Sequence, residues 1–177
     1  MAYWNTRGLR GSAFEEMINF TNEQYMRHGL ATIQKIPTPI TPTRLDKDTH
    51  TISEAYFNRQ STVDYIGAAQ GVPICFDAKS TERKNLPLQN VHRHQLEFMS
   101  AFRGQRGLAF VLVQFQTTDE VFLLPFETLR DYWQAIPCGG RKSIPYSAFR
   151  RDLLVKNSGG FPVHYLEAVN VYLALKY

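Results

Sequence analysis

The run from Leu108 to Phe115 is almost entirely apolar, and it constrains the fold more than any other segment. A strand of this kind must be covered on both faces, because alternate side chains point to opposite sides of a sheet. Apolar residues at helical spacing predict the covering helices, which we place over residues 12–29, 91–102, 126–134 and 163–175. These patterns predict an α/β fold with a central mixed β-sheet flanked by helices.

Further strands are predicted over residues 31–36, 63–66, 72–79 and 121–124, with a turn at Gly67 and Gly71 between the second and third of these. Three prolines between Pro37 and Pro42 exclude a helix or a central strand there. We expect residues 39–50 to form an exposed, extended excursion from a single domain that spans residues 1–177.

The first helix carries an acidic residue whose role the sequence leaves open. Ser12 and Glu15 have the spacing of a capping box, with Ser12 as N-cap. The apolar face of this helix then runs from Phe14 to Tyr25. Glu15 is therefore either a capping residue or an acid available to a site.

Composition excludes some classes of protein. No run of about 18 apolar residues occurs, so no membrane span is expected. The segment from Met1 to Arg10 lacks the apolar stretch of a secretory signal, which favours a cytoplasmic protein. Cys75 lies in an apolar run and Cys138 in a Gly-rich loop, so neither a disulfide framework nor a zinc site is predicted.

The net charge of +4 is unevenly distributed along the chain. Residues 79–106 and 130–156 each sum to +4, whereas residues 46–78 sum to −3. A nuclease needs this combination, since basic residues attract phosphates while carboxylates hold a cation. Proteins of other classes show similar blocks, so the charge pattern is only compatible with that function.

The most informative residues are Asp64, Asp77 and Lys79. Asp64 belongs to one predicted strand, and Asp77-Ala78-Lys79 ends the next. A hairpin brings such positions together at one sheet edge, and alternation puts Asp77 and Lys79 on one face with Ala78 opposite. Two carboxylates can bind Mg²⁺, while a nearby lysine orients water and shields the charge of a phosphate. The alternative is that all three are ordinary solvated side chains.

Longer sequence segments around these residues resemble those of a known protein family. Asp64…Asp77-x-Lys79 looks like the core of the PD-(D/E)xK nucleases, and several segments resemble the RecU family of Holliday-junction resolvases in the same order. These segments are Lys35-Ile36-Pro37-Thr38-Pro39-Ile40, Glu54-Ala55-Tyr56-Phe57, Ser61-Thr62-Val63-Asp64-Tyr65, Gln70-Gly71, Phe76-Asp77-Ala78-Lys79, Asn90-Val91-His92-Arg93-His94-Gln95 and Asp119-Glu120-Val121-Phe122-Leu123-Leu124-Pro125.

The resemblance implies a restriction-endonuclease-like core with residues 39–50 as a protruding stalk. It also implies a cytoplasmic, nucleoid-associated homodimer that nicks four-way junction DNA symmetrically with Mg²⁺, or with Mn²⁺ in its place. Asp64 and Asp77 would be metal ligands, Lys79 the catalytic lysine, and Glu15 a fourth catalytic position. A strand-exchange recombinase and a branch-migration helicase are the protein partners that it implies.

Candidate DNA contacts surround this site, and each has a structural alternative. They are Arg7 and Arg10 (phosphate contacts or a solvated arm), Arg44 and Lys47 (the stalk), Tyr56 and Phe57 (base stacking or packing), Thr62 (a phosphate contact or an ordinary strand residue) and Gln95 (near the site or structurally hydrogen-bonded).

Two departures from the family affect the functional prediction. The family usually has Glu where this chain has Asp77, and the stalk is a few residues shorter. The open alternatives are therefore a related nuclease without junction preference, and a junction-binding or recombinase-modulating protein that does not cleave. A purely structural α/β domain is the remaining alternative.

Overall fold

The computed structural model describes residues 8–37, 40–46, 49, 51–57 and 62–175, without the side chains of residues 8–12, 40, 42, 45, 56 and 57. Its helices are α1 (Gly8–Arg27), α2 (Arg93–Gly104), α3 (Phe126–Ala135) and α4 (Tyr165–Ala174). Its strands are β1 (Ala31–Lys35), β2 (Ile40–Asp46), β3 (Thr51–Phe57), β4 (Tyr65–Ala69), β5 (Val72–Thr81), β6 (Asn85–Pro87), β7 (Leu108–Phe115), β8 (Glu120–Pro125), β9 (Ser143–Pro145), β10 (Leu154–Ser158) and β11 (Phe161–His164).

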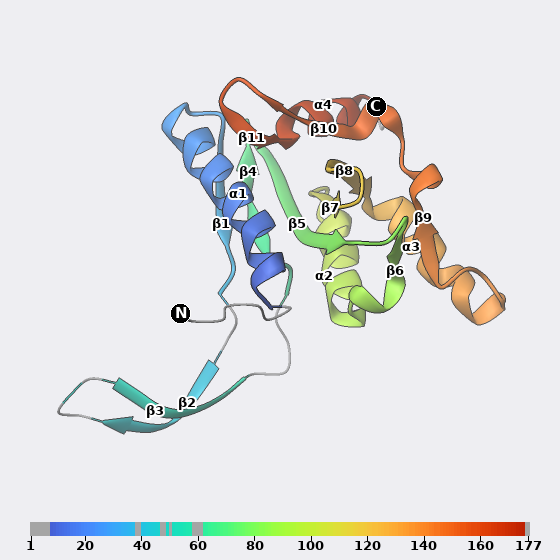
Figure 1. The fold of residues 1–177 in the computed structure, drawn as a ribbon. Coiled ribbons are helices and arrows are strands. Elements are labelled where there is room, and N and C mark those ends of the chain that lie inside the picture. Colours follow the sequence, from blue (N-terminus) through green and yellow to red (C-terminus); the bar gives the residue numbers. More distant parts are fainter. Residues whose placement is uncertain (1–7, 38–39, 47–48, 50, 58–61, 176–177) are drawn as a thin grey trace.

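Seven strands form one sheet in the order β1-β4-β5-β7-β8-β10-β11 (Figure 1). The pair β5–β7 is parallel, and every other neighbouring pair is antiparallel. The sheet is therefore mixed, as predicted. Its centre is β7, which spans the predicted residues, with buried side chains at every position but Gln114.

Two apolar clusters cover the two faces of the sheet. On one face, Phe14, Ile18 and Tyr25 of α1 pack with Tyr165 and other residues of α4. On the other, Leu96 and Met99 of α2 pack with Phe126 and Leu129 of α3. These two layers, called the α1/α4 face and the α2/α3 face below, confirm the predicted α/β fold.

A separate two-stranded hairpin, β2–β3, projects from the body of the molecule at the place predicted for the stalk (Figure 1). It pairs Ile40 with Phe57 and Asp46 with Thr51, so it extends beyond the predicted end at residue 50. Two irregularities in the pairing lie on either side of Arg44. The prolines are compatible with a hairpin because neither strand is central in a sheet.

Several local predictions need correction. Helix α1 begins at Gly8, so Ser12 lies inside the helix and is not its N-cap. Gly67 lies inside β4, where a Cβ atom would stand 2.0 Å from the carbonyl oxygen of Thr32 on β1. The β4–β5 turn is instead made by Gln70 and Gly71, both with positive φ, as in the tight hairpin turns that match strand twist. Strands β3, β6, β9, β10 and β11 were not predicted.

Candidate active site

The candidate site lies where the β4–β5 hairpin opens. Asp64 is the last residue before β4, not a strand residue as predicted, and Tyr65 pairs with Phe76. This register places Asp64 beside Asp77, which confirms that the two acids meet. The backbone N–H of Asp64 donates to Oδ1 of Asp77 at 3.0 Å, and the N–H of Ala78 donates to Oδ2 of Asp64 at 2.9 Å.

Strand alternation assigns the side chains of Asp77 and Lys79 to one face of the sheet. Asp77 pairs with Val111, which belongs to the α2/α3 face, and Ala78 pairs with Leu112 of the α1/α4 face. Lys79 therefore points the same way as Asp77, and its Nζ lies 2.8 Å from Oδ2 of Asp77. The predicted alternation of Asp77, Ala78 and Lys79 is confirmed.

Burial gives this acidic pair unusual electrostatics. The Asp77 side chain is fully buried, and the Lys79 side chain is 17% exposed. Burial, followed by the charge of Asp77, raises the pKa of Asp64 from 3.8 to about 6, although Lys79 and the N–H of Ala78 act in the opposite direction. Two carboxylates held this closely repel each other when both are ionised.

The residues present fit a divalent cation. Oδ2 of Asp77 is buried and accepts no hydrogen bond of good geometry, although the Lys79 ammonium lies 2.8 Å from it. Mg²⁺ commonly uses one or two carboxylates and completes its coordination with water and substrate phosphate. Within the described residues, no three His, Cys, Asp or Glu side chains gather into a metal-holding cluster, so the protein donors here would be Asp64 and Asp77.

Glu15 is engaged with Lys35 and lies outside the contacts that join Asp64, Asp77 and Lys79. Helix α1 packs on the α1/α4 face, and the Glu15 carboxylate pairs with Nζ of Lys35 at 2.5 Å. The next residue, Ile36, donates its N–H to the carbonyl oxygen of Asp64 at 2.8 Å. Lys35 was not singled out from the sequence. Its place at the start of a segment that resembles the RecU family, near the end of the strand predicted over residues 31–36, could have indicated it.

The remaining candidates are dispersed. Thr62 is half-buried two residues before Asp64. Gln95 is buried at the start of α2, where its Oε1 accepts the N–H of His92 in a capping box. It therefore makes the structural hydrogen bond that was one of the two roles predicted for it. Arg44 lies on the hairpin and pairs with Glu54 at 3.5 Å. Arg7 and Lys47, and the side chains of Arg10, Tyr56 and Phe57, lie outside the described residues.

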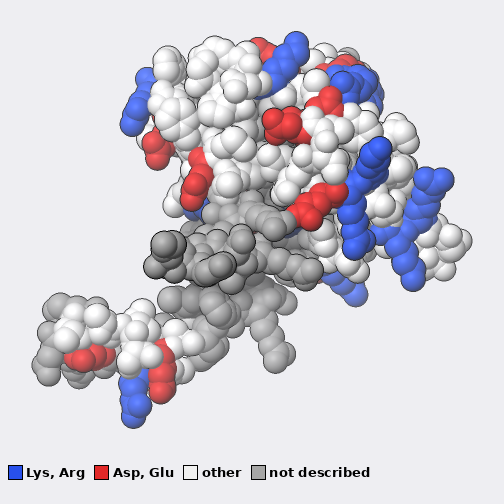
Figure 2. Space-filling model, in the orientation of Figure 1, with Lys and Arg blue, Asp and Glu red and all other residues white. Residues whose placement is uncertain are grey.

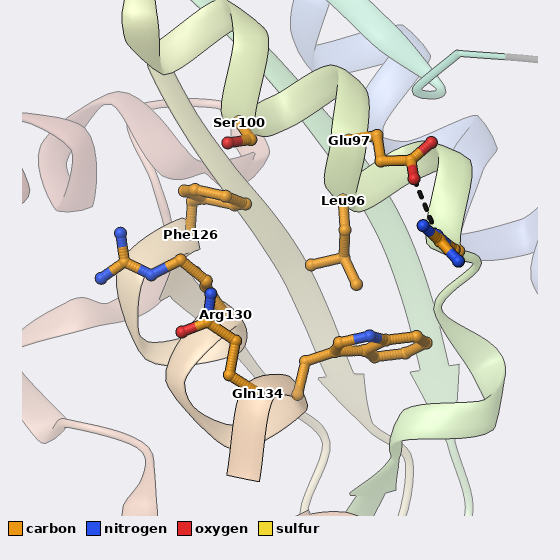
Figure 3. Close-up of a pocket in the computed structure, with 8 residues that line it drawn as sticks. Leu96, Glu97, Ser100, Phe126, Arg130 and Gln134 are labelled. Atoms are coloured by element: carbon orange, nitrogen blue, oxygen red, sulfur yellow. Dashed lines mark hydrogen bonds and ion pairs between the residues drawn. The ribbon is translucent and has the colours of Figure 1, made fainter. Parts of the chain in front are cut away.

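A pocket lies between α2 and α3 (Figure 3). Leu96, Phe126 and Trp133 give it apolar walls, and Arg130 and Glu97 lie at its rim. None of Asp64, Asp77 and Lys79 lines it. It therefore has no part in the candidate chemistry.

Two carboxylates and a lysine on one face of a mixed sheet are the side chains expected of a metal-dependent nuclease. The family model for Recombination protein U (RecU) matches residues 9–171. The chain therefore belongs to the RecU family. None of its helices, within the described residues, is long and apolar enough to cross a membrane.

Individual relatives agree with this assignment. The chain is 41% identical to the Holliday junction resolvase RecU of Streptococcus oralis over 170 residues, which cover 93% of this chain and 84% of that protein. It is 39% identical to RecU of Levilactobacillus brevis, over 94% of this chain and 86% of the relative. Among solved structures, Archaeoglobus fulgidus Hjc aligns with a TM-score of 0.42 and 12% identity, over 67% of this chain and 74% of Hjc. That structural likeness alone defines neither fold nor function.

Proposed function

We propose that this chain is a Holliday-junction resolvase, a metal-dependent endonuclease that nicks four-way DNA junctions in recombination and repair. The observation that carries the proposal is the contact of Asp64, Asp77 and Lys79 on one face of the sheet. Relatives that are 39–41% identical and bear the resolvase name support the choice of substrate.

In the proposed mechanism, Asp64 and Asp77 hold Mg²⁺, with Mn²⁺ as a substitute. When bound, the cation acidifies a water molecule and offsets negative charge on the phosphate. Lys79 is oriented in advance by Asp77, so its ammonium can position the attacking water and neutralise a phosphate oxygen. Because Lys79 is largely shielded from solvent, its charge acts more strongly than it would at the surface.

Glu15 is proposed to complete the site by positioning. It holds Lys35, and the neighbouring Ile36 holds the backbone of Asp64. The path Glu15–Lys35–Ile36–Asp64 thus links α1 to the metal-binding acid through an ion pair, a hydrogen bond and the backbone between them.

Symmetric cleavage requires two equivalent sites, and we propose that a two-fold homodimer supplies them. The projecting β2–β3 hairpin is proposed to enter the centre of the junction as the stalk (Figure 1). The proposed DNA-contacting residues remain those named from the sequence: Arg7, Arg10, Arg44, Lys47, Tyr56, Phe57, Thr62 and Gln95.

A panel of labelled substrates tests the proposal. Four-way junctions, flaps and linear duplexes are incubated with the protein with and without Mg²⁺, beside an Asp64→Ala variant. Preferential nicking of the junction that disappears without metal and in the variant is the expected result. Equal cleavage of all substrates would replace junction resolution with general nuclease activity. Tight junction binding without cleavage in Mg²⁺ or Mn²⁺ would instead indicate a non-cleaving junction-binding protein.

A further inference from the structure

Most basic side chains of the described residues are neutralised by an acidic neighbour. The exposed pairs Arg150–Asp152 and Arg151–Glu120, for example, have N–O distances of 2.6 and 2.8 Å. In the described part of the chain, the cations without such a partner are Arg83, Lys84, Arg106, Arg141, Lys142 and Lys156. Four of these six flank a single small sheet, β6–β9, and are called the β6–β9 basic patch: Arg83, Lys84, Arg141 and Lys142.

The backbone under this patch is fixed. The Thr81 hydroxyl is buried, accepts the N–H of Arg83 at 3.1 Å and donates to the carbonyl oxygen of Asn85 at 3.1 Å. Before the other strand, β9, Gly140 donates its N–H to the carbonyl oxygen of Ala135 at 2.8 Å. A Cβ atom at Gly140 would lie 2.6 Å from that residue, so only glycine permits this close turn before Arg141.

The two halves of the patch lie at opposite ends of the small sheet. The N–H of Tyr146 donates to the carbonyl oxygen of Lys84, and the N–H of Leu88 donates to that of Lys142. Tyr146 lies four positions after Lys142, so the two lysines stand roughly 13 Å apart along the strand at about 3.3 Å per residue. This span exceeds the advance of about 3.4 Å per nucleotide along one DNA strand, so the two halves reach different phosphates.

The patch lies on the same side of the central sheet as the candidate active site. Leu86 of β6 and Ile144 of β9 are fully buried in the α2/α3 face, the face toward which Asp77 and Lys79 point. All four cationic residues are exposed. Figure 2 shows Lys and Arg side chains gathered over the region where Figure 1 places β6 and β9. The patch is thus separate from the buried acids but accessible from the same side.

We infer that the β6–β9 basic patch binds the phosphate backbone of a duplex arm, away from the nicked phosphodiester. The inference rests on the proposed DNA substrate and assigns a surface that neither the acids nor the hairpin provides. Unpaired, exposed cations on a fixed backbone suit phosphates, because no ion pair within the protein has to break before they bind. Such contacts position DNA without reading its sequence.

The test compares pairs of substitutions that remove equal charge. Arg83→Gln/Lys84→Gln and Arg141→Gln/Lys142→Gln each remove two charges from the patch. Arg106→Gln/Lys156→Gln removes two unpaired charges elsewhere and is the matched control. Affinity for a four-way junction and for a linear duplex is measured by fluorescence anisotropy across a salt series, with folding checked by circular dichroism. Single-turnover cleavage is measured at saturating protein.

Each patch variant should bind both DNAs at least tenfold more weakly than the control variant. The slope of log K against log[salt] should become shallower by about 0.9 for each phosphate that the variant no longer neutralises. The saturated cleavage rate should stay within about twofold of wild type, since Lys79 is unchanged. Equal affinity and slope in patch and control variants would overturn the inference, as would a lower saturated rate at unchanged affinity. Failure of the wild-type protein to bind any DNA would instead refute the proposed function.

Discussion

The backbone N–H of Asp64 donates a 3.0 Å hydrogen bond to Oδ1 of Asp77. This bond ties the residue before β4 to the middle of β5, and the N–H of Ala78 in turn donates to Oδ2 of Asp64 at 2.9 Å. The two carboxylates are therefore held in place by each other's strands. They cannot separate without breaking these bonds, so burial and, after it, the repulsion from Asp77 raise the pKa of Asp64.

The first prediction concerns stability without metal. The pKa of Asp64 rises from 3.8 in the unfolded chain to about 6 in the fold, so the unfolded state ionises first as pH increases. Stability is unaffected below pH 3.8, falls between the two values, and carries the full cost above pH 6. At about 1.4 kcal/mol per pKa unit, the cost is on the order of 2–3 kcal/mol.

Asp64→Asn removes this charge and should raise the melting temperature relative to wild type at pH 8 in EDTA, but not at pH 3.5. Thermal melts of both proteins at the two pH values measure the difference. The same gap at both values would show that ionisation of Asp64 carries no folding cost.

A second prediction concerns the cation. A ligand that binds only the folded state stabilises it, by about 2.7 kcal/mol at one hundred times its Kd. Saturating Mg²⁺ should therefore raise the melting temperature of the wild-type protein at pH 8, where protons compete least with the cation for the Asp64 carboxylate. The Asp64→Asn protein should show little of this increase. An equal increase in both proteins would place the stabilising cation elsewhere.

The third prediction separates the structural and chemical roles of Lys79. Lys79→Met leaves the Asp77 charge buried without its cation, and removing one partner of a buried pair costs about 3–5 kcal/mol. The double variant Asp77→Asn/Lys79→Met removes both charges and should recover most of the stability measured by urea unfolding. Neither variant should cleave junction DNA. Cleavage by the stable double variant would remove this pair from the mechanism.

The fourth prediction addresses Glu15. If it acts through Lys35 on the backbone at Asp64, Glu15→Gln and Lys35→Met should each slow cleavage by roughly tenfold, within the effect of small misplacements of reacting groups. The pair is partly exposed, so its loss should cost no more than about 1 kcal/mol of stability. A cleavage defect in Glu15→Gln alone would indicate that Glu15 acts directly on the substrate or cation. Full activity in both variants would show that the Glu15–Lys35 ion pair has no role in cleavage.

The sequence predicted the fold best where a strand is buried on both faces and almost every residue must therefore be apolar. The nearly unbroken apolar run predicted both ends of β7 correctly, and alternation placed Asp77 and Lys79 on a common face. Short strands carried too little pattern. Strands β10 and β11 have five and four residues and are separated by Gly159 and Gly160, so their positions depend on pairing with β8 and with each other.

The site was predictable in composition but not in its supporting contacts. The spacing of Asp64 and Asp77 indicated that they would meet, but backbone hydrogen bonds to their carboxylates have no sequence signal. Glu15 looked like a capping residue because Ser12 stands three positions earlier, whereas α1 begins at Gly8. Its ion pair joins residues 20 positions apart, so it depends on how α1 packs beside β1.

Mapping of the nicks at nucleotide resolution tests the central claim most directly. A four-way junction is labelled on each strand in turn and incubated with Mg²⁺ and either the wild-type or the Asp64→Asn protein. We predict one nick on each of two opposed strands, at matching positions across the crossover, and none with the variant. Nicks scattered along the arms, or nicks that persist in the variant, would contradict assignment of a resolvase site to Asp64, Asp77 and Lys79.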